Sequence, residues 1–338
     1  MDSELGYRKP AGSRWRRSAP VISLVLLSPI ISEILFGSTH ISNLYVLIPE
    51  LGVWGCGALL IRWIVRRANK GEISILLLGI ALAVAEECVI QQTSFFPLVG
   101  IDPQGIFGRA LGVNWIYLLW AIGYESIWTV AIPIQLTETI FSNRRKDSWL
   151  GWRGVAIASI VFLLGSIIAW YSWTRFVVPL YSPGYVVSPS YPGIAAIVII
   201  VLVVIAMSVP STIDRTNGVR KLAPLPWLVG GLTFVVSLTW FYLVFLAYFK
   251  NINLPAAIPA MAGLIMASGF FALITNWSGR SGWQDKHRFA LVFGAMIASM
   301  SAGFIVSGMT LPIDFLGKFV MDLIALSLLV FLRRRIRN

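Results

Sequence analysis

The sequence predicts an all-α fold, a polytopic integral membrane helical bundle of about ten transmembrane helices with both termini in the cytoplasm. Composition is the first reason. The chain has 338 residues, of which 57% are hydrophobic and 12% charged, with a mean hydropathy of +0.79. A soluble domain is about half apolar and about a quarter charged. The recurrence of long apolar stretches and the alternation of basic connections are the other two reasons.

The apolar stretches define the expected elements, because crossing a bilayer core takes about 20 apolar residues per helix. They lie at 20–38, 44–65, 73–93, 114–141, 154–174, 192–210, 226–248, 254–275, 288–308 and 314–332. No connection is long enough for a soluble domain, so 20–332 is expected to form a single transmembrane domain between basic cytoplasmic tails at 1–19 and 333–338. Within it, we expect a polar functional bundle (20–141), an apolar scaffold (154–308) and a closing helix (314–332).

Basic residues gather at both termini and in every second connection, which is typical of cytoplasmic segments. They are Arg8, Lys9, Arg14, Arg16, Arg17, Arg62, Arg66, Arg67, Lys70, Arg144, Arg145, Lys146, Arg153, Arg215, Arg220, Lys221, Arg280, Lys286, Arg288, Arg333, Arg334, Arg335 and Arg337. The alternation requires an even number of helices. It also explains the net charge of +12, so membrane lipids rather than nucleic acid are the expected partners. We expect Arg62 to extend with Arg66 to the cytoplasmic face.

Five glutamates interrupt the first four apolar stretches: Glu33, Glu50, Glu86, Glu87 and Glu125. A carboxylate at membrane depth costs roughly 2.5–3.5 kcal/mol, so such residues usually face a bundle interior and have a function. The expected topology puts four of them in one outer-leaflet layer and Glu125 below, near the midplane. Like charges this close cannot all stay ionised without compensation.

The facing of the adjacent pair follows from helical geometry. Glu86 and Glu87 point about 100° apart on an α-helix, so both cannot face one cavity equally well. Because Glu87 shares a face with Gln91, we expect these two to line the interior and Glu86 to bond a neighbouring helix; the reverse is the alternative. Arg109 and Lys318 are the basic side chains expected to reach the layer.

The last stretch carries Asp314, Lys318 and Asp322 at i, i+4 and i+8, a spacing that allows an ion pair along one helix face. Asp314 is expected to enter the outer layer. The alternative for the whole set is interhelical hydrogen bonding without a ligand. The candidate ion-, ligand- or proton-binding residues are Glu33, Glu50, Glu86, Glu87, Gln91, Asn114, Glu125, Asp314, Lys318 and Asp322.

Two external loops, 94–113 and 175–191, are rich in glycine, proline and aromatic residues. They are expected either to cover an outward-facing cavity as lids or to form an aromatic belt with turns. Gly52, Gly55 and Gly57 give the second helix a small face and indicate close helix packing.

The segment EECVIQQ (86–92) is similar to the EExxxR motif of the CAAX-protease and bacteriocin-processing family of membrane glutamic proteases. Gln91 or Gln92 stands where that family has arginine. The family's later helices also carry histidines, whereas His40 and His287 are expected in loops. A glutamate base without these partners makes a poor enzyme.

A longer resemblance covers the first four helices. The segments SPIISEILFGST (28–39), GVWGCGALLIRWIVRR (52–67), AVAEECVIQQTSF (83–95) and LGVNWIYLLW (111–120) resemble a family of uncharacterised bacterial multi-pass membrane proteins. This resemblance implies a bacterial cytoplasmic membrane location but brings no activity.

Three classes of function remain. The first is a transporter or permease with an outward-facing, carboxylate-lined cavity, coupled to a cation or proton and carrying an undefined small substrate or ion. The second is an intramembrane enzyme, and the third is a non-catalytic scaffold or partner subunit. No catalytic residue or cofactor is expected, whether a metal binds is left open, and the oligomeric state is not defined. The chain lacks a Walker motif, so ATP hydrolysis would require another chain.

Overall fold

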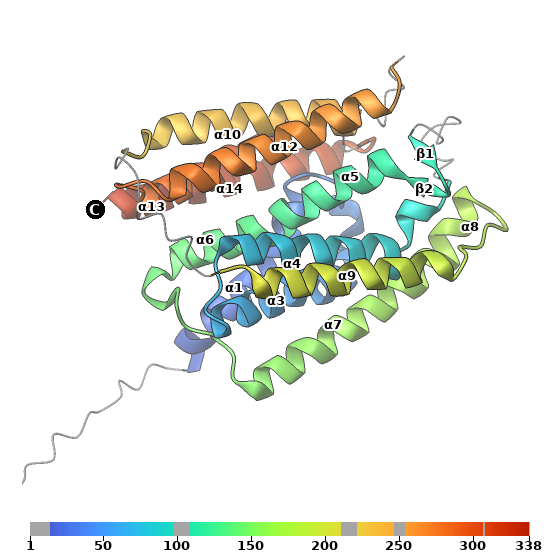
Figure 1. The fold of residues 1–338 in the computed structure, drawn as a ribbon, viewed down its shortest axis with the longest axis horizontal. Coiled ribbons are helices and arrows are strands. Elements are labelled where there is room, and N and C mark those ends of the chain that lie inside the picture. The colour runs from blue at the N-terminus through green and yellow to red at the C-terminus, as the bar shows by residue number, and fades with distance from the viewer. Residues whose placement is uncertain (1–13, 98–107, 211–221, 247–253, 307, 338) are drawn as a thin grey trace, which may run out of the picture.

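The computed structural model describes residues 14–97, 108–210, 222–246, 254–306 and 308–337 of the chain, which form a bundle of roughly aligned helices (Figure 1). Within these residues, nine helices are long and apolar enough to cross a membrane. They are Ile41–Arg67, Glu72–Ile90, Trp115–Ile140, Trp152–Tyr181, Ser190–Ser208, Pro226–Val244, Ala257–Ser278, Asp285–Ile305 and Pro312–Ile336. A shorter apolar helix, Ser18–Ile34, precedes them. Each predicted stretch therefore coincides with an apolar helix.

Several of these helices are composite, because α-helical segments alternate with wider π-helical turns. The α-helices are α1 (Arg14–Pro29), α2 (Leu47–Glu50), α3 (Gly57–Arg67), α4 (Glu72–Ala85), α5 (Trp115–Tyr124), α6 (Ile132–Ile140), α7 (Trp152–Ser172), α8 (Val178–Tyr181), α9 (Ser190–Ser208), α10 (Pro226–Trp240), α12 (Ala257–Ser278), α13 (Asp285–Val306) and α14 (Pro312–Arg337). The π-helical segments are η1 (Ile30–Ile34), η3 (Leu51–Cys56), η4 (Glu86–Ile90), η6 (Glu125–Ala131), η8 (Trp173–Val177) and η9 (Phe241–Leu246). Short 3₁₀ turns occur at η2 (Ile41–Val46), η5 (Thr93–Phe95) and η7 (Ser142–Arg144).

The described strands form one small antiparallel hairpin, in which β1 (Arg109–Ala110) pairs with β2 (Val113–Asn114). It lies at one end of the bundle, directly before α5 (Figure 1). The fold is otherwise helical, as the sequence predicts. Some predicted features lie outside the described residues: 1–13 of the basic tail, 98–107 of the first external loop, and the basic residues of 211–221.

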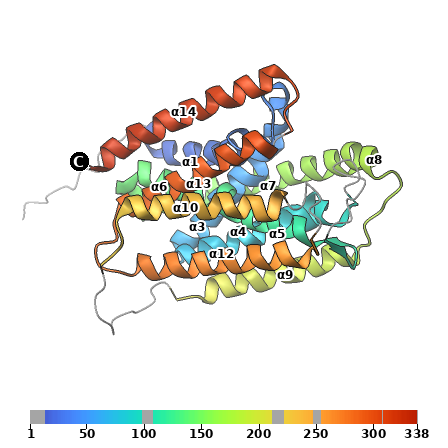
Figure 2. The ribbon, with the colours of Figure 1, turned by 90° about the horizontal axis from the view of Figure 1, so that it is seen from above.

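Burial divides the helices into central and peripheral groups. About half or more of each apolar window is buried in Ile41–Arg67, Glu72–Ile90, Trp115–Ile140 and Asp285–Ile305, against 11% in Trp152–Tyr181. Figure 2 shows this division into central and peripheral helices, with α14 and α9 at opposite edges and α3 and α4 between them. The centre is thus formed by the first four helices together with α13, which the sequence had assigned to the apolar scaffold.

Glycines allow the closest helix contacts in the centre. A Cβ on Gly52 would lie 2.8 Å from the carbonyl oxygen of Val161 in α7. A Cβ on Gly55 would overlap the backbone of Val25 in α1, and one on Gly57 would meet the side chain of Leu82 in α4. The predicted packing role is therefore confirmed. The three glycines face three different helices rather than one.

Replacing Gly303 by alanine should destabilise the protein. Its Cβ would overlap the carbonyl oxygen of Phe36 and approach Lys318 Cε at 3.0 Å, so α13 would have to move away from the chain that follows η1. Overpacking of this kind costs typically about 1–3 kcal/mol. The measurement is the thermal unfolding midpoint of the detergent-purified protein. Gly269→Ala in α12 is the matched control, because nothing lies within 4 Å of its Cβ position. Equal midpoints for the two variants would contradict the close approach.

Candidate functional site

The glutamates of the first four helices coincide with the π-helical segments of those helices. Glu33 lies within η1, Glu50 directly precedes η3, and Glu86 and Glu125 begin η4 and η6. A π turn is closed by an i→i+5 hydrogen bond, such as that from the Gln91 amide to the Glu86 carbonyl at 2.8 Å. Such turns are rare overall, and those that occur are often found at functional sites. This coincidence distinguishes the acidic positions from ordinary polar residues of a helix.

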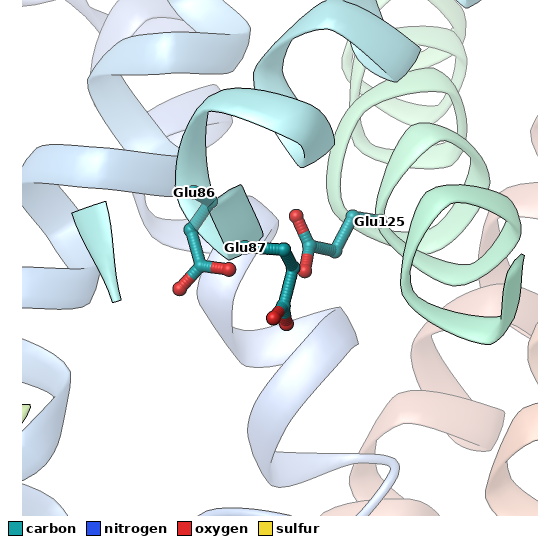
Figure 3. Close-up of side chains that lie close together, drawn as sticks. All are labelled: Glu86, Glu87 and Glu125. Atoms are coloured by element: carbon teal, nitrogen blue, oxygen red, sulfur yellow. The ribbon is translucent and has the colours of Figure 1, made fainter. Parts of the chain in front are cut away.

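Glu86, Glu87 and Glu125 form one buried cluster, the triglutamate site. One carboxylate oxygen from each lies within 4.8 Å of the others. Figure 3 shows Glu125 reaching from its own helix toward the adjacent pair. Two expectations need correction. Glu86 and Glu87 both contribute, because a widened turn holds more residues and neighbours diverge by less than the 100° of an α-helix. Glu125 belongs to the same group rather than to a deeper level.

A hydroxyl from Tyr117 in α5 completes the contacts of Glu87. Tyr117 donates its phenolic hydrogen to Glu87 Oε1 at 2.8 Å, which orients that carboxylate. The Oε2 atoms of Glu86, Glu87 and Glu125 are buried and have no hydrogen-bond partner. The site therefore presents oxygen atoms that face no donor.

Glu33 and Glu50 form a second acidic pair, joined by Thr39. Thr39 Oγ1 lies 2.9 Å from Glu33 Oε2 and 3.2 Å from Glu50 Oε1, and Ser38 also donates to Glu33 at 2.6 Å. A hydroxyl has one hydrogen, so it cannot donate to both carboxylates at once. A proton or cation on the pair would complete the bridge. Glu33 is half-buried and lies within electrostatic range of both Glu50 and Glu86, which links the pair to the triglutamate site.

Basic side chains do not neutralise these carboxylates. Within the described residues, none of the ion pairs includes Glu33, Glu50 or the triglutamate site. The two cations expected to reach the layer have other partners. Arg109 donates to Asn114 Oδ1 and to the Phe95 carbonyl, and Lys318 donates to Asp322 at 2.7 Å.

Asp314 and Lys318 of α14 hold the segment that follows η1. Lys318 pairs with Asp322, as the i, i+4 spacing predicts, and also donates to the Leu35 carbonyl at 2.6 Å. Asp314 accepts hydrogen bonds from the amide and hydroxyl of Ser42 and lies 3.5 Å from His40 Nδ1. These contacts fix both ends of the segment that carries Thr39. In the structure, the α14 charges position the site from outside it.

Asn114 and Gln91 form hydrogen bonds with residues outside the triglutamate site. Asn114 is buried and donates to the Phe96 carbonyl. Gln91 is half-buried, and its side-chain oxygen accepts a hydrogen bond from Thr93 at 3.4 Å.

The described parts of segments 94–113 and 175–191 contact one another, although 175–181 continues a helix as η8 and α8 rather than forming a loop. Arg109 donates to the hydroxyl of Tyr185, Ser182 donates to the Pro97 carbonyl, and Tyr191 donates to the Leu111 carbonyl. The loops thus form one structure at the end of the bundle that carries the β hairpin. Whether they act as lids stays a prediction.

The C-terminal part of α3 carries a network of ion pairs and hydrogen bonds. Arg62 is fully buried and does not extend to a surface, contrary to the sequence-based expectation. It donates to Glu138 at 2.9 Å and to the carbonyls of Arg145 and Asp147, and its guanidinium stacks 3.2 Å from the Trp149 ring centre. Arg66 adds two more hydrogen bonds to Glu138. A buried charge is tolerated when it is paired and fully hydrogen-bonded in this way.

Tyr117, Thr39 and Ser38 are the site residues that the sequence did not indicate. They are neutral and common in membrane helices and loops, so only tertiary contacts identify them.

No protein-family model, curated protein or solved structure matches the chain. The chemistry of the site therefore rests on its geometry: five carboxyl groups, several oxygen atoms without donors, and hydroxyls that orient them.

Replacing Arg62 by methionine should lower the free energy of unfolding by about 3 kcal/mol, because it breaks a buried ion pair and leaves Glu138 with Arg66 as its remaining counter-charge. The carbonyls of Arg145 and Asp147 would also lose their donors. Equilibrium unfolding in mixed micelles measures the change.

Arg153→Met is the matched control. Arg153 is exposed at the start of α7 and takes part in none of the ion pairs of the described residues. If both variants unfold at the same denaturant concentration, the buried network is not a major stabilising element.

Proposed function

We propose that this protein is an integral membrane transporter that binds a cation or exchanges protons at its buried glutamates. It would reside in a bacterial cytoplasmic membrane with both termini in the cytoplasm, and its substrate would be a small molecule or ion. The nine apolar helices of the described residues are compatible with insertion. The alternating basic connections support this orientation.

A single observation carries the proposal: five carboxyl groups share the interior of the bundle without a basic partner among the described residues. Each costs roughly 2.5–3.5 kcal/mol at membrane depth unless it is compensated. Interhelical hydrogen bonding alone does not compensate them, because Glu50, Glu86, Glu87 and Glu125 each retain a buried oxygen without a donor. A cation or proton is the missing partner, and residues of this kind commonly mark ion and proton pathways.

The two ends of the bundle support an outward-facing site. Glu33 is half-buried next to the exposed Ser38, so the acidic group is closest to the surface at that end. Arg62 lies about 18 Å further along the helix from Glu50. There it helps close the opposite, basic end through Glu138. This asymmetry fits a carrier that is closed on its cytoplasmic side.

Enzyme and scaffold functions fit the site less well. His40 lies beside Asp314, and His287 contacts the Pro224 carbonyl. The group of His, Cys, Asp and Glu side chains that could hold a metal, within the described residues, contains only glutamates. A protease of the glutamic type needs a general base with positioned partners. A passive scaffold would gain nothing from a cluster this costly to bury.

Transport predicts that Glu87→Gln abolishes proton- or cation-dependent flux in proteoliposomes while the protein remains folded. The amide keeps the size and the Tyr117 contact but removes the titratable charge. Flux is followed with a pH-sensitive dye under imposed ion gradients.

Asp147→Asn is the matched control, because that side chain is 56% exposed and pairs only with Arg144 on the surface. Normal flux in Glu87→Gln would remove the central claim, as would equal loss in both variants.

The expected orientation has its own test. Fusion of a reporter active only in the cytoplasm to the C-terminus after Asn338 should give full activity, since an even number of spans returns the chain to the side of its start. A reporter that is active only outside the cytoplasm should be silent at the same position. The opposite result would contradict the orientation without bearing on the carboxylates.

A further inference from the structure

We propose that the triglutamate site of Glu86, Glu87 and Glu125 binds a divalent metal ion with oxygen-only ligands, of the class of Mg²⁺, Mn²⁺ or Ca²⁺. The inference rests on the proposed function and deepens it, because it names the chemical class of the cation. The spacing of the ligand atoms, the oxygens that lack donors and the types of side chain present all support such a site.

The spacing of the oxygens fits one ion. Oxygen ligands lie about 2.0–2.6 Å from Mg²⁺ or Ca²⁺, so two oxygens bound to the same ion are at most roughly 4–5 Å apart. One carboxylate oxygen from each glutamate lies within 4.8 Å of the other two. Glu86 and Glu87 reach this common space through the π turn that begins at Glu86, and Glu125 through the π turn that it begins itself.

The second observation concerns unpartnered atoms. Glu86, Glu87 and Glu125 are 1%, 4% and 6% exposed, and the Oε2 atom of each has no hydrogen-bond donor. A buried acceptor without a donor costs about 1–3 kcal/mol, and more when it is charged. Each of the three side chains therefore retains an oxygen atom that a metal ion could take as a ligand.

The ligand types select the class of ion. All three side chains are carboxylates, and neither a histidine nor a cysteine belongs to the group within the described residues. Carboxylate oxygens suit Mg²⁺, Ca²⁺ and Mn²⁺, whereas imidazole and thiolate favour Zn²⁺ and copper. A divalent ion also balances more of the negative charge that these carboxylates can carry than a single sodium ion would.

Tyr117 acts as an outer-shell residue in this arrangement. Its hydroxyl holds Glu87 Oε1 at 2.8 Å, while Glu87 Oε2 has no donor. Hydrogen bonds of this kind fix the orientation of a metal ligand, and their loss typically lowers metal affinity 10–100-fold.

The test is a Mn²⁺ titration of the full-length protein in detergent, in which electron paramagnetic resonance reports free Mn²⁺. The wild type should bind one ion per chain, with Mg²⁺ or Ca²⁺ competing. Glu86→Gln and Glu125→Gln should each weaken binding at least tenfold. Tyr117→Phe should weaken it about 10–100-fold while all three carboxylates remain. Asp147→Asn should bind as the wild type.

Failure of either idea can be recognised separately. Absence of Mn²⁺ binding, or equal binding in the wild type and both glutamine variants, overturns the metal site. If Glu87→Gln still abolishes proton or sodium flux, the proposed function then stands without it. Specific Mn²⁺ binding in a protein that carries no flux supports the metal site and overturns transport. Where a glutamine variant is poorly folded, loss of the Mn²⁺-dependent rise in unfolding midpoint in Tyr117→Phe decides the question.

Discussion

The absence of a basic counter-charge beside the buried glutamates is the constraint on which the other features of the described bundle depend. Carboxyl groups from four helices form the triglutamate site and the Glu33–Glu50 pair, and ionised groups there repel one another unless protons or cations intervene. The hydroxyls of Thr39 and Tyr117 contact these groups, and α14 holds the segment that carries Thr39. Glycines allow close helix contacts around these groups. The central helices are therefore organised to keep acidic groups together rather than to separate them.

The two ends of the bundle treat buried charge in opposite ways. At the end of Arg62, the buried charges are paired, and Glu138 accepts hydrogen bonds from two arginines. Such a paired network resists change, since loss of one member leaves another buried with less compensation. At the end of Glu33, the acidic groups have no basic partner among the described ion pairs. This difference between the two ends is consistent with the proposed carrier function.

Much of the fold follows from the sequence because a helix that faces lipid must be apolar along its whole length. The predicted stretch 44–65 became Ile41–Arg67, and the i, i+4 spacing of Lys318 and Asp322 correctly predicted their ion pair. The facing of Glu86 and Glu87 could not be predicted, because hydropathy does not distinguish a π turn from an α turn. Long basic side chains were harder still: Arg62 has an extended chain whose partners lie in a connecting segment far away in sequence, so tertiary contacts alone decide where its charge lies.

The π turns have a consequence for how such a chain tolerates change in length. A turn closed by an i→i+5 bond contains one residue more than the α-helical turn it replaces. Deleting a single residue within Glu86–Ile90 would restore an α-helical turn in which neighbouring side chains again diverge by about 100°, while the residues beyond the turn would keep their facing. The helix would remain long enough to cross a bilayer, but one of its two glutamates would leave the shared space. Helix length and the direction of the carboxylates are thus independent properties here. A one-residue deletion in this helix would change the direction of a carboxylate while the helix kept its normal hydropathy.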